Sequence, residues 1–432
     1  MKNYFPSQAV SDLEKMLPEY GLKVAKAIES EWFYNDINKA YGRYFSYKND
    51  FNKLRLYSRG EQSVKKYKDE LSINGDLSYL NLDWKPVPII PKFVDIVVNG
   101  LSQRNYDIKA YSQDPFGVAK RTDYMESILR DIRTRDYNKM VEQATGVSLT
   151  ENDEANMPQN EEELKLHMQL TYKQAVEIAE EQAINVLLEG NRYELVKKQF
   201  YYDLTVLGIG AVKTSFNTSE GVVVDYVDPV DLVYSHTDSP YFDDIYYVGE
   251  VKTIPINELV KQFPNLTESE IKEISQNNYG HRHRNQYGYR NDYDKNHVQV
   301  LYFNYKTYMN EVYKVKETGS GAERAIEKDD NFNPPEDKEG NFKKLQRSVE
   351  CLYEGVYVLN SNKLLKWEMA SNMMRPKSDY TKVKMNYSIV APHIYEGRID
   401  SLVKRITGFA DMIQLTHLKL QQVMSRMIPD GI

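Results

Sequence analysis

The spacing of hydrophobic residues changes several times along the chain, and each change marks an expected element. Over residues 12–40, apolar side chains recur every three or four positions with breaks at Pro18 and Gly21, so we expect short packing helices. Residues 83–91 contain too many prolines for a helix or a central strand, and they lead into an apolar helical run over residues 94–101. A rigid segment therefore delivers a helix to the core.

Helical spacing continues through the next part of the chain, with one acidic interruption. A charged helix is expected over residues 116–137, followed by an acidic surface loop over residues 148–163. Residues 171–189 predict a better helix that ends at Gly190, and a second helix follows from Tyr193. One side of the helix over residues 171–189 is apolar, through Ala175, Val176, Ile178, Ala179, Ala183, Val186 and Leu187.

After Gly208-Ile209-Gly210 the apolar period becomes two, which is typical of strands. Residues 211–216 and 222–227 predict a hairpin with a turn between them. Further extended segments are expected over residues 230–234 and 245–251, so a β-rich layer accompanies the helices. The chain is therefore predicted to be an α+β protein.

The following region mixes short helices, polar segments and strands. Helices are expected over residues 256–263 and 267–274, and Thr267 with Glu270 forms a capping box at the start of the second. Residues 276–295 are polar and unpatterned and predict a loop. Residues 317–344 cannot bury enough apolar area to order themselves. Strands are expected over residues 298–308, 311–315, 348–359 and 364–369, the first two as a hairpin.

The last segment is the most regular, and it predicts one long helix that starts near Tyr395. Its apolar positions keep alternating steps of three and four, with only Thr416 breaking the seam. Some 30 residues at 1.5 Å per residue give a rod of about 45 Å. Such a helix either packs against its own domain or lines up beside copies of itself. The seam consists of Ile399, Leu402, Ile406, Phe409, Ile413, Leu420, Val423 and Met427.

Composition narrows the classes of function. The 432 residues exceed the size at which a single core usually stops growing, so two or more packed units are expected. With 63 acidic and 56 basic residues the net charge is −7, which disfavours tight binding to nucleic acid. The 35 tyrosines suit subunit contacts as well as half-buried sheets, since tyrosine supplies apolar area with a hydroxyl that tolerates partial exposure.

Cysteine usage and hydropathy point to the compartment. Cys351 is the single cysteine, so we expect no internal disulfide and no zinc site around it, and we interpret it as a small buried apolar residue. Neither a signal peptide nor about 18 uninterrupted apolar residues occur. We therefore expect a protein that is made and used in a cytosol-like compartment, without a membrane.

Two glycine- and aspartate-bearing patterns could carry chemistry, and each has a simpler structural interpretation. Gly208-Ile209-Gly210 begins like a dinucleotide-binding fingerprint, but Lys213 stands where that pattern needs a glycine, so a tight helix-to-strand turn is favoured. Clustered carboxylates could hold Mg²⁺ in a nuclease, but no lysine or histidine is placed as an evident base, so turn-forming or capping aspartates are favoured. These aspartates are Asp225, Asp228, Asp231, Asp238, Asp243 and Asp244.

One basic run could bind an anion or a metal. His281, Arg282, His283 and Arg284 alternate two imidazoles with two guanidinium groups, but no third metal ligand is visible. A solvated basic loop is the favoured interpretation, and contact with DNA or an acidic partner is the alternative. Because no Walker A, nucleophile elbow, HExxH or kinase-type motif occurs, we predict that the chain is not an enzyme and needs no cofactor or metal.

Taken in order, these segments resemble the portal protein, or head-to-tail connector, of tailed bacteriophages of the short-tailed type, which includes the crAss-like group. The resemblance spans most of the chain and lies in the order of the segments. They are residues 57–62, 84–91, 93–104, 107–108, 171–189, 202–210, 227–234, 243–244, 256–264, 298–308 and 397–398, the last of which open the final helix.

The resemblance implies a closed ring of twelve subunits at one vertex of the capsid, assembled in the host cytoplasm and retained in the virion. Residues 1–255 would form an outer wing, residues 256–392 a stem and a clip, and residues 393–432 a long helix that returns along the channel. Double-stranded DNA would pass through the channel during packaging and ejection. The partners implied are other copies of the chain, the major capsid protein, the terminase motor and the tail adaptors.

Within this interpretation, two sets of residues are candidates for binding. Basic residues of the final helix are candidates for transient phosphate contacts, namely Lys404, Arg405, Lys419 and Arg426. The basic run from His281 to Arg284 and the polar segment 317–344 are candidates for partner binding, the latter as a clip element. Two rival functions stay open: a tail or adaptor protein, and a metal-dependent nuclease that uses the aspartates.

Overall fold

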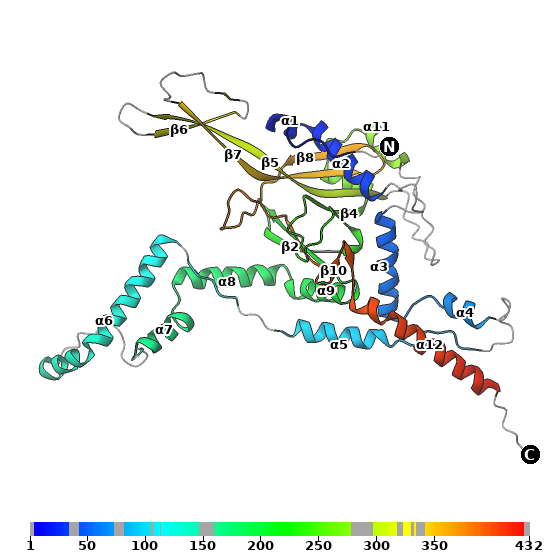
Figure 1. Ribbon diagram of the computed structural model, residues 1–432, viewed down its shortest axis with the longest axis horizontal. Helices are drawn as coiled ribbons and strands as arrows, with labels where there is room; N and C mark the ends of the chain where they lie inside the picture. The colour runs from blue at the N-terminus through cyan, green and yellow to red at the C-terminus, as the bar shows by residue number, and fades with distance from the viewer. Residues whose placement is uncertain are drawn as a thin grey trace, which may run out of the picture. The chain divides into compact units, whose positions relative to one another are not determined.

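The computed structural model describes residues 4–33, 43–72, 82–104, 108–112, 114–146, 158, 160–277, 297–317, 323–329, 332–333 and 342–426. Contacts divide the chain into two compact units, one formed by Met1–Gln103 with Leu195–Ile432 and the other by Arg104–Glu194. Both helices and strands are abundant, so the predicted α+β class is confirmed (Figure 1).

The first unit contains most of the helices and all the described strands. Its helices are α1 (Asp12–Met16), α2 (Pro18–Trp32), α3 (Arg43–Arg59), α4 (Lys65–Leu71), α5 (Ile90–Ser102), most of α9 (Tyr193–Val206), α10 (Ile256–Gln262), α11 (Glu268–Asn277) and α12 (Leu402–Arg426). Its strands are β1 (Gly210–Asn217), β2 (Gly221–Val227), β3 (Leu232–Tyr234), β4 (Tyr247–Pro255), β5 (His297–Glu317), β6 (Glu323–Lys328), β7 (Phe342–Val358), β8 (Lys363–Met369), β9 (Tyr387–Val390), β10 (Ile394–Tyr395) and β11 (Arg398–Ile399).

An antiparallel sheet in the order β3-β4-β5-β7-β8 forms the centre of this unit. The expected hairpin within residues 298–315 is wrong, because β5 runs unbroken to Glu317 and pairs with β7 through Asn310 and Ser348. Strands from both sides of residue 255 belong to this sheet, since β4 pairs with β5 up to Pro255. The division into wing, stem and clip stays a prediction.

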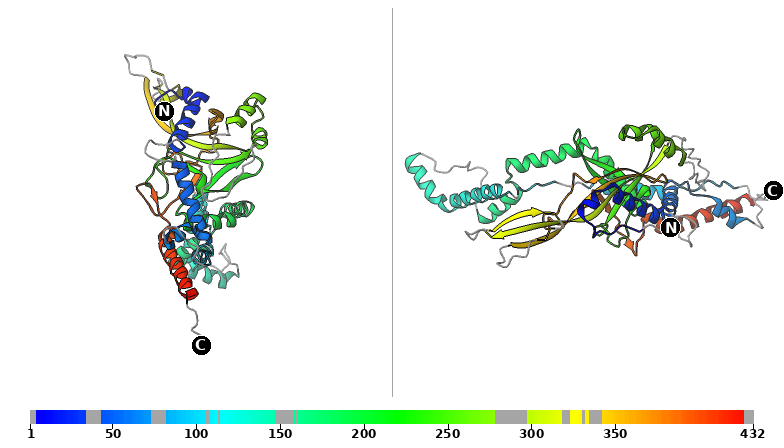
Figure 2. Two further views of the ribbon diagram at one scale, coloured as in Figure 1. Left: turned by 90° about the vertical axis from the view of Figure 1, so that its right-hand side faces the viewer. Right: turned by 90° about the horizontal axis from the view of Figure 1, so that it is seen from above.

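Beyond the reach of β4 and β8, β5 and β7 continue as a two-stranded ribbon, and β6 joins β5 to make it three-stranded (Figure 2). The expectation that residues 317–344 cannot order is therefore wrong for β6 and for the first residues of β7. All six residues of β6 are exposed, so its order comes from the backbone hydrogen bonds offered by β5 and not from apolar burial.

Helix α2 packs on β7 and β8, and Gly21 lies against Trp367 of β8. A β-carbon at Gly21 would lie 2.3 Å from the Trp367 ring, so the position requires glycine. The helix runs through Gly21 without a break, which corrects the expected interruption there, whereas Pro18 does start a new helix.

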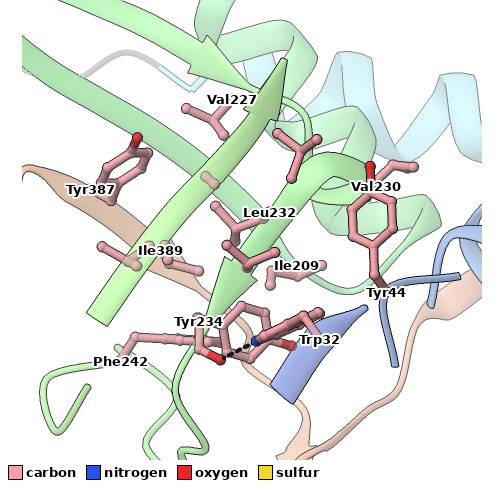
Figure 3. Packing of buried hydrophobic residues seen from close by; sticks show 14 of the residues in the cluster. Trp32, Tyr44, Ile209, Val227, Val230, Leu232, Tyr234, Phe242, Tyr387 and Ile389 are labelled. Carbon is pink, nitrogen blue, oxygen red and sulfur yellow. Dashed lines mark hydrogen bonds between the residues drawn. The ribbon is translucent and has the colours of Figure 1, made fainter. Parts of the chain in front are cut away.

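The core joins these helices to both sheets (Figure 3). Trp32 of α2 donates its indole N–H to the carbonyl of Tyr234 on β3 over 3.2 Å. The second sheet, in the order β2-β1-β9, adds Val227 and Ile389 to the same cluster. The hairpin predicted over residues 211–227 is confirmed as β1 and β2.

Several tyrosines are fully buried in the interior of the protein. Tyr357 is fully buried, and its hydroxyl donates to Glu29 Oε2 over 2.7 Å. Tyr247 is also fully buried and donates to Glu31 Oε2 over 2.7 Å. The hydroxyl of Tyr357 thus supplies a hydrogen bond that the buried carboxylate of Glu29 requires.

The second unit is helical, with α6 (Pro115–Thr145), α7 (Glu161–Leu170) and α8 (Ala175–Gly190). Its small core packs Ile128 of α6 against Leu164 and Met168 of α7. The start of α7 corrects the predicted loop, whose residues 161–163 are helical, while residues 148–157 and 159 lie outside the described ones. Glu177 caps α8 by accepting hydrogen bonds from the backbone N–H groups of Gln174 and Ser112, both over 2.9 Å.

Candidate interaction surface on the C-terminal helix

Helix α12 begins at Leu402, later than the sequence predicted. Tyr395 and Ile399 belong to the short antiparallel pair β10–β11, which turns at Glu396 and Gly397, both with positive φ. Ser401 then starts the helix by accepting a hydrogen bond from the backbone N–H of Lys404 over 3.0 Å. The segment from Gly397 to Asp400 is therefore a hairpin and a cap, not the first turns of the helix.

The face of α12 that packs on its own unit contains two buried polar side chains, Asp411 and Gln414. Asp411 accepts hydrogen bonds from Tyr57 over 2.8 Å and Tyr67 over 2.6 Å, and Lys66 pairs with its other oxygen. Burial raises the pKa of the Asp411 carboxyl, but these three donors outweigh burial and hold its pKa below the ordinary value. The carboxylate thus joins α12 to α3 and α4.

Two glutamines on the same face fasten the proline-rich segment to α12. Gln414 is only 1% exposed, and its Oε1 accepts from the backbone N–H of Val87 over 2.8 Å. Gln421 Oε1 accepts from the backbone N–H of Asp83 over 3.2 Å. Because this segment runs beside α12 and continues into α5, the sequence prediction of a rigid lead-in to a core helix is confirmed.

The apolar seam of α12 faces the other way. Phe409 is 65% exposed and Leu420 is 57% exposed. A helix normally buries its apolar stripe, whereas α12 buries Val403 and Leu418 and leaves a second set of large apolar side chains exposed. The exposed apolar residues are Leu402, Phe409, Met412, Ile413, Leu420, Val423 and Met424, and we call them the outward seam.

Arg405 and Lys419 lie along one edge of the outward seam, whereas Lys404 lies on the opposite side of the helix. Arg405 Nε donates to Asp400 Oδ2 over 2.6 Å, and this bond, with the charge of Arg405, holds the pKa of Asp400 below its ordinary value. Lys404 Nζ donates to the carbonyl of Ile399 over 3.3 Å. Lys419 is exposed, and the side chain of Arg426 lies outside the described part. His281, Arg282, His283 and Arg284 also lie outside it.

Several of the aspartates proposed for a nuclease have structural roles. Asp228 accepts two hydrogen bonds from Arg55, over 2.9 and 2.8 Å, and caps the 3-10 turn η2 (Pro229–Asp231). Asp231 pairs with Lys48, and Asp238 accepts the backbone N–H of Gly397. Among the residues that the structure describes, no three His, Cys, Asp or Glu side chains converge as a metal site.

The Arg55 cluster was missed by sequence reasoning. Arg55 also pairs with the buried Asp203 over 2.9 Å, and Asp203 accepts from the hydroxyl of Tyr226. The hydrogen bonds from Arg55 to Asp228, together with the charges of both carboxylates, outweigh the effect of burial and raise the pKa of the guanidinium. This arginine links α3, α9 and the β2–η2 junction, so the cluster stabilises the fold.

The structure bears out the predictions made for Gly208 and Cys351. Gly208 follows α9 and precedes β1 with φ +81°, and a β-carbon there would lie 2.3 Å from the carbonyl oxygen of Asp400, so the tight turn is confirmed. Cys351 is buried as predicted, and burial raises the pKa of its thiol to about 12.

No model of a known protein family matches the chain, and no curated protein matches it in a sequence search. None of the described helices is both long and apolar enough to cross a bilayer.

Proposed function

We propose that the chain is the portal subunit of a tailed bacteriophage, which assembles into a closed cyclic ring and conducts DNA into and out of the capsid. The observation that carries the proposal is the outward seam of α12. The helix buries Asp411 and Gln414 but leaves Phe409 and Leu420 exposed. An exposed apolar surface of this kind is typical of a binding site for another molecule. A homo-oligomeric ring supplies that molecule as a further copy of the chain.

The surface charge also supports a conduit. Lys404 is exposed on α12, whereas the whole chain carries a net charge of −7. A few basic groups on an acidic protein provide weak phosphate contacts that salt weakens further, so DNA can slide along them. Arg405 is already paired with Asp400 and is the weaker candidate for phosphate contact.

The ribbon of β5, β6 and β7 is the candidate clip, which would dock the terminase motor and later the tail adaptors. It extends beyond the sheet and exposes charged side chains, including Arg324, Lys343 and Arg347. Replacing residues 318–341 with a short turn should leave the central sheet folded and abolish binding of the motor and adaptors. If both partners still bind this variant, the clip assignment is wrong.

Electron microscopy of the purified full chain tests the proposal. We expect a symmetric ring with a central hole about as wide as duplex DNA. A stable monomer at micromolar concentration contradicts it. A ring or tube that attaches below the portal vertex would instead identify a tail or adaptor protein, whose subunits could use the same outward seam.

A nuclease assay separates the remaining rival. That function requires Mg²⁺-dependent cleavage of DNA that is lost in Asp225→Ala. We expect no cleavage by the wild-type chain or by Asp225→Ala, because Asp228 and Asp231 form ion pairs with Arg55 and Lys48.

A further inference from the structure

The outward seam of α12 has the heptad pattern of a helix that packs on another helix. Ile413 and Leu420 lie seven residues apart, Leu402 and Phe409 are also seven apart, and Val423 falls on the same seam. The positions along one edge of the seam include Arg405 and Lys419. The positions along its other edge include Val403 and Ala410, which are buried in the same subunit.

These two edges make pairing between two copies of α12 unfavourable. In an antiparallel pair, the basic edges would face each other, and like charges in that position are destabilising. In a parallel pair, the basic edge of each helix would lie against the edge of the other helix that carries Val403 and Ala410. That edge is already buried within its own subunit. The surface that fits the outward seam is therefore a different one, apolar along its centre and acidic along its side.

Helix α8 has that chemistry. Its apolar positions Val176, Ala179, Ala183 and Val186 follow steps of three and four, and all four are exposed. Glu177 is its one buried side chain, so the apolar side predicted to pack is left uncovered within its own unit. Among the described α-helices, α8 is the one whose sequence contains acidic residues and no Lys, Arg or His.

We propose that α8 of one copy packs against the outward seam of α12 of a second copy, a partner choice that rests on the proposed ring. The large side chains of Phe409, Ile413 and Leu420 would fit over Ala179 and Ala183, and the exposed Glu180, beside the apolar side of α8, would lie toward the basic edge. The lengths agree, since the 16 residues of α8 and residues 409–424 of α12 each span about 24 Å. Because the contact joins two different surfaces, its repetition generates a ring or an open filament.

Cross-linking between two chains that each carry one introduced cysteine tests this contact directly. The Ala183→Cys and Ile413→Cys variants, with different affinity tags, are co-expressed in one cell, purified and oxidised. The native thiol of Cys351 is 2% exposed and contributes little background. We expect covalent dimers that carry both tags, and their absence overturns the proposal.

The matched control replaces the second site and keeps the first. Phe216 on β1 is an apolar residue as exposed as Leu420, so Phe216→Cys has a similarly accessible thiol outside the proposed contact. We expect Ala183→Cys with Phe216→Cys to give no dimer above the level of random collision. Equal yields from the two pairs would mean that the cross-link does not report a specific contact.

Charge reversal gives a second readout. We expect Lys419→Glu to weaken assembly about tenfold, measured as the apparent dissociation constant by analytical ultracentrifugation. Adding Glu180→Lys to the same chain should restore it. Assembly of the double variant no stronger than that of Lys419→Glu contradicts the pairing.

The outcomes separate this inference from the portal proposal. Cross-linked particles without a central hole would overturn the portal function and keep the α8–α12 contact. A ring with a central hole that yields no cross-link would keep the portal function and overturn the contact.

Discussion

The hydroxyl of Tyr57 on α3 donates a hydrogen bond to Oδ1 of Asp411 on α12 over 2.8 Å. Tyr67 on α4 donates to the same oxygen, and Lys66 pairs with the other. A buried carboxylate is tolerated only where its oxygens are hydrogen-bonded, so the three donors decide that the Asp411 side of α12 turns inward. The apolar seam is left outside as a consequence.

Asp411→Asn should destabilise the protein without removing the side chain's volume. The amide keeps one acceptor oxygen but loses the charge that Lys66 and both tyrosines stabilise, which should lower the free energy of unfolding by about 1–3 kcal/mol. Urea unfolding followed by far-UV circular dichroism measures the change. Asp69→Asn, on the exposed side of α4, is the control and should leave the midpoint unchanged.

Acid should remove the same stabilisation in a defined pH range. The pKa of Asp411 lies below its ordinary value in the folded protein, and an unfolded aspartate titrates at about 3.9. Because the folded pKa is the lower one, the contribution is complete above the unfolded pKa and is lost as the pH falls through the folded pKa.

The difference in unfolding free energy between wild type and Asp411→Asn should therefore be constant from about pH 6 to 8 and shrink below about pH 4. Unfolding midpoints at a series of pH values provide the measurement. A difference that keeps its full size at pH 3 would show that the charge of Asp411 is not its source.

Local signals in the sequence predicted the elements whose partners are close along the chain. The β1–β2 hairpin closes over residues 217–221, and the capping box of α11 joins Thr267 and Glu270, whose backbone and side chain exchange hydrogen bonds. Both depend on residues a few positions apart, so period and turn chemistry were sufficient to predict them.

The elements that depend on distant residues were missed. Asn310 was interpreted as part of a turn, but its backbone N–H donates to Asp12 of α1 and its side chain accepts from Ser348 of β7, so the strand continues through it. The seam of α12 was predicted correctly as a pattern, yet the sequence could not show that Tyr57 and Val87 would make the polar side the buried one.

Gly355→Ala should destabilise the central sheet through a single contact. Gly355 pairs with Phe303 across β5 and β7, and a β-carbon there would lie 2.3 Å from the ring of that buried phenylalanine. Overpacking of this kind costs about 1–3 kcal/mol. The matched control is Gly100→Ala on α5, where nothing lies within 4 Å of the added carbon and stability should be kept or slightly raised.

A double-mutant cycle identifies the clash as the cause. Phe303→Leu removes the ring atoms that the new methyl group meets, so Gly355→Ala should cost less in that background than in wild type. Thermal unfolding of the four proteins provides the comparison. Equal costs in both backgrounds would place the strain elsewhere.

The two sides of α12 should respond oppositely to substitution. Phe409→Glu with Ile413→Glu places charge on the outward seam, where it should abolish assembly and leave the unfolding of the separated subunit unchanged, since both residues are exposed there. Leu418→Ala empties a fully buried position and should lower the free energy of unfolding by about 2–5 kcal/mol. Sedimentation velocity reports assembly, and unfolding at a protein concentration below the assembly threshold reports subunit stability, because association itself stabilises the folded state. If the double glutamate variant unfolds as readily as Leu418→Ala, the seam is packed within its own subunit. If that variant still assembles, the subunits meet through another surface.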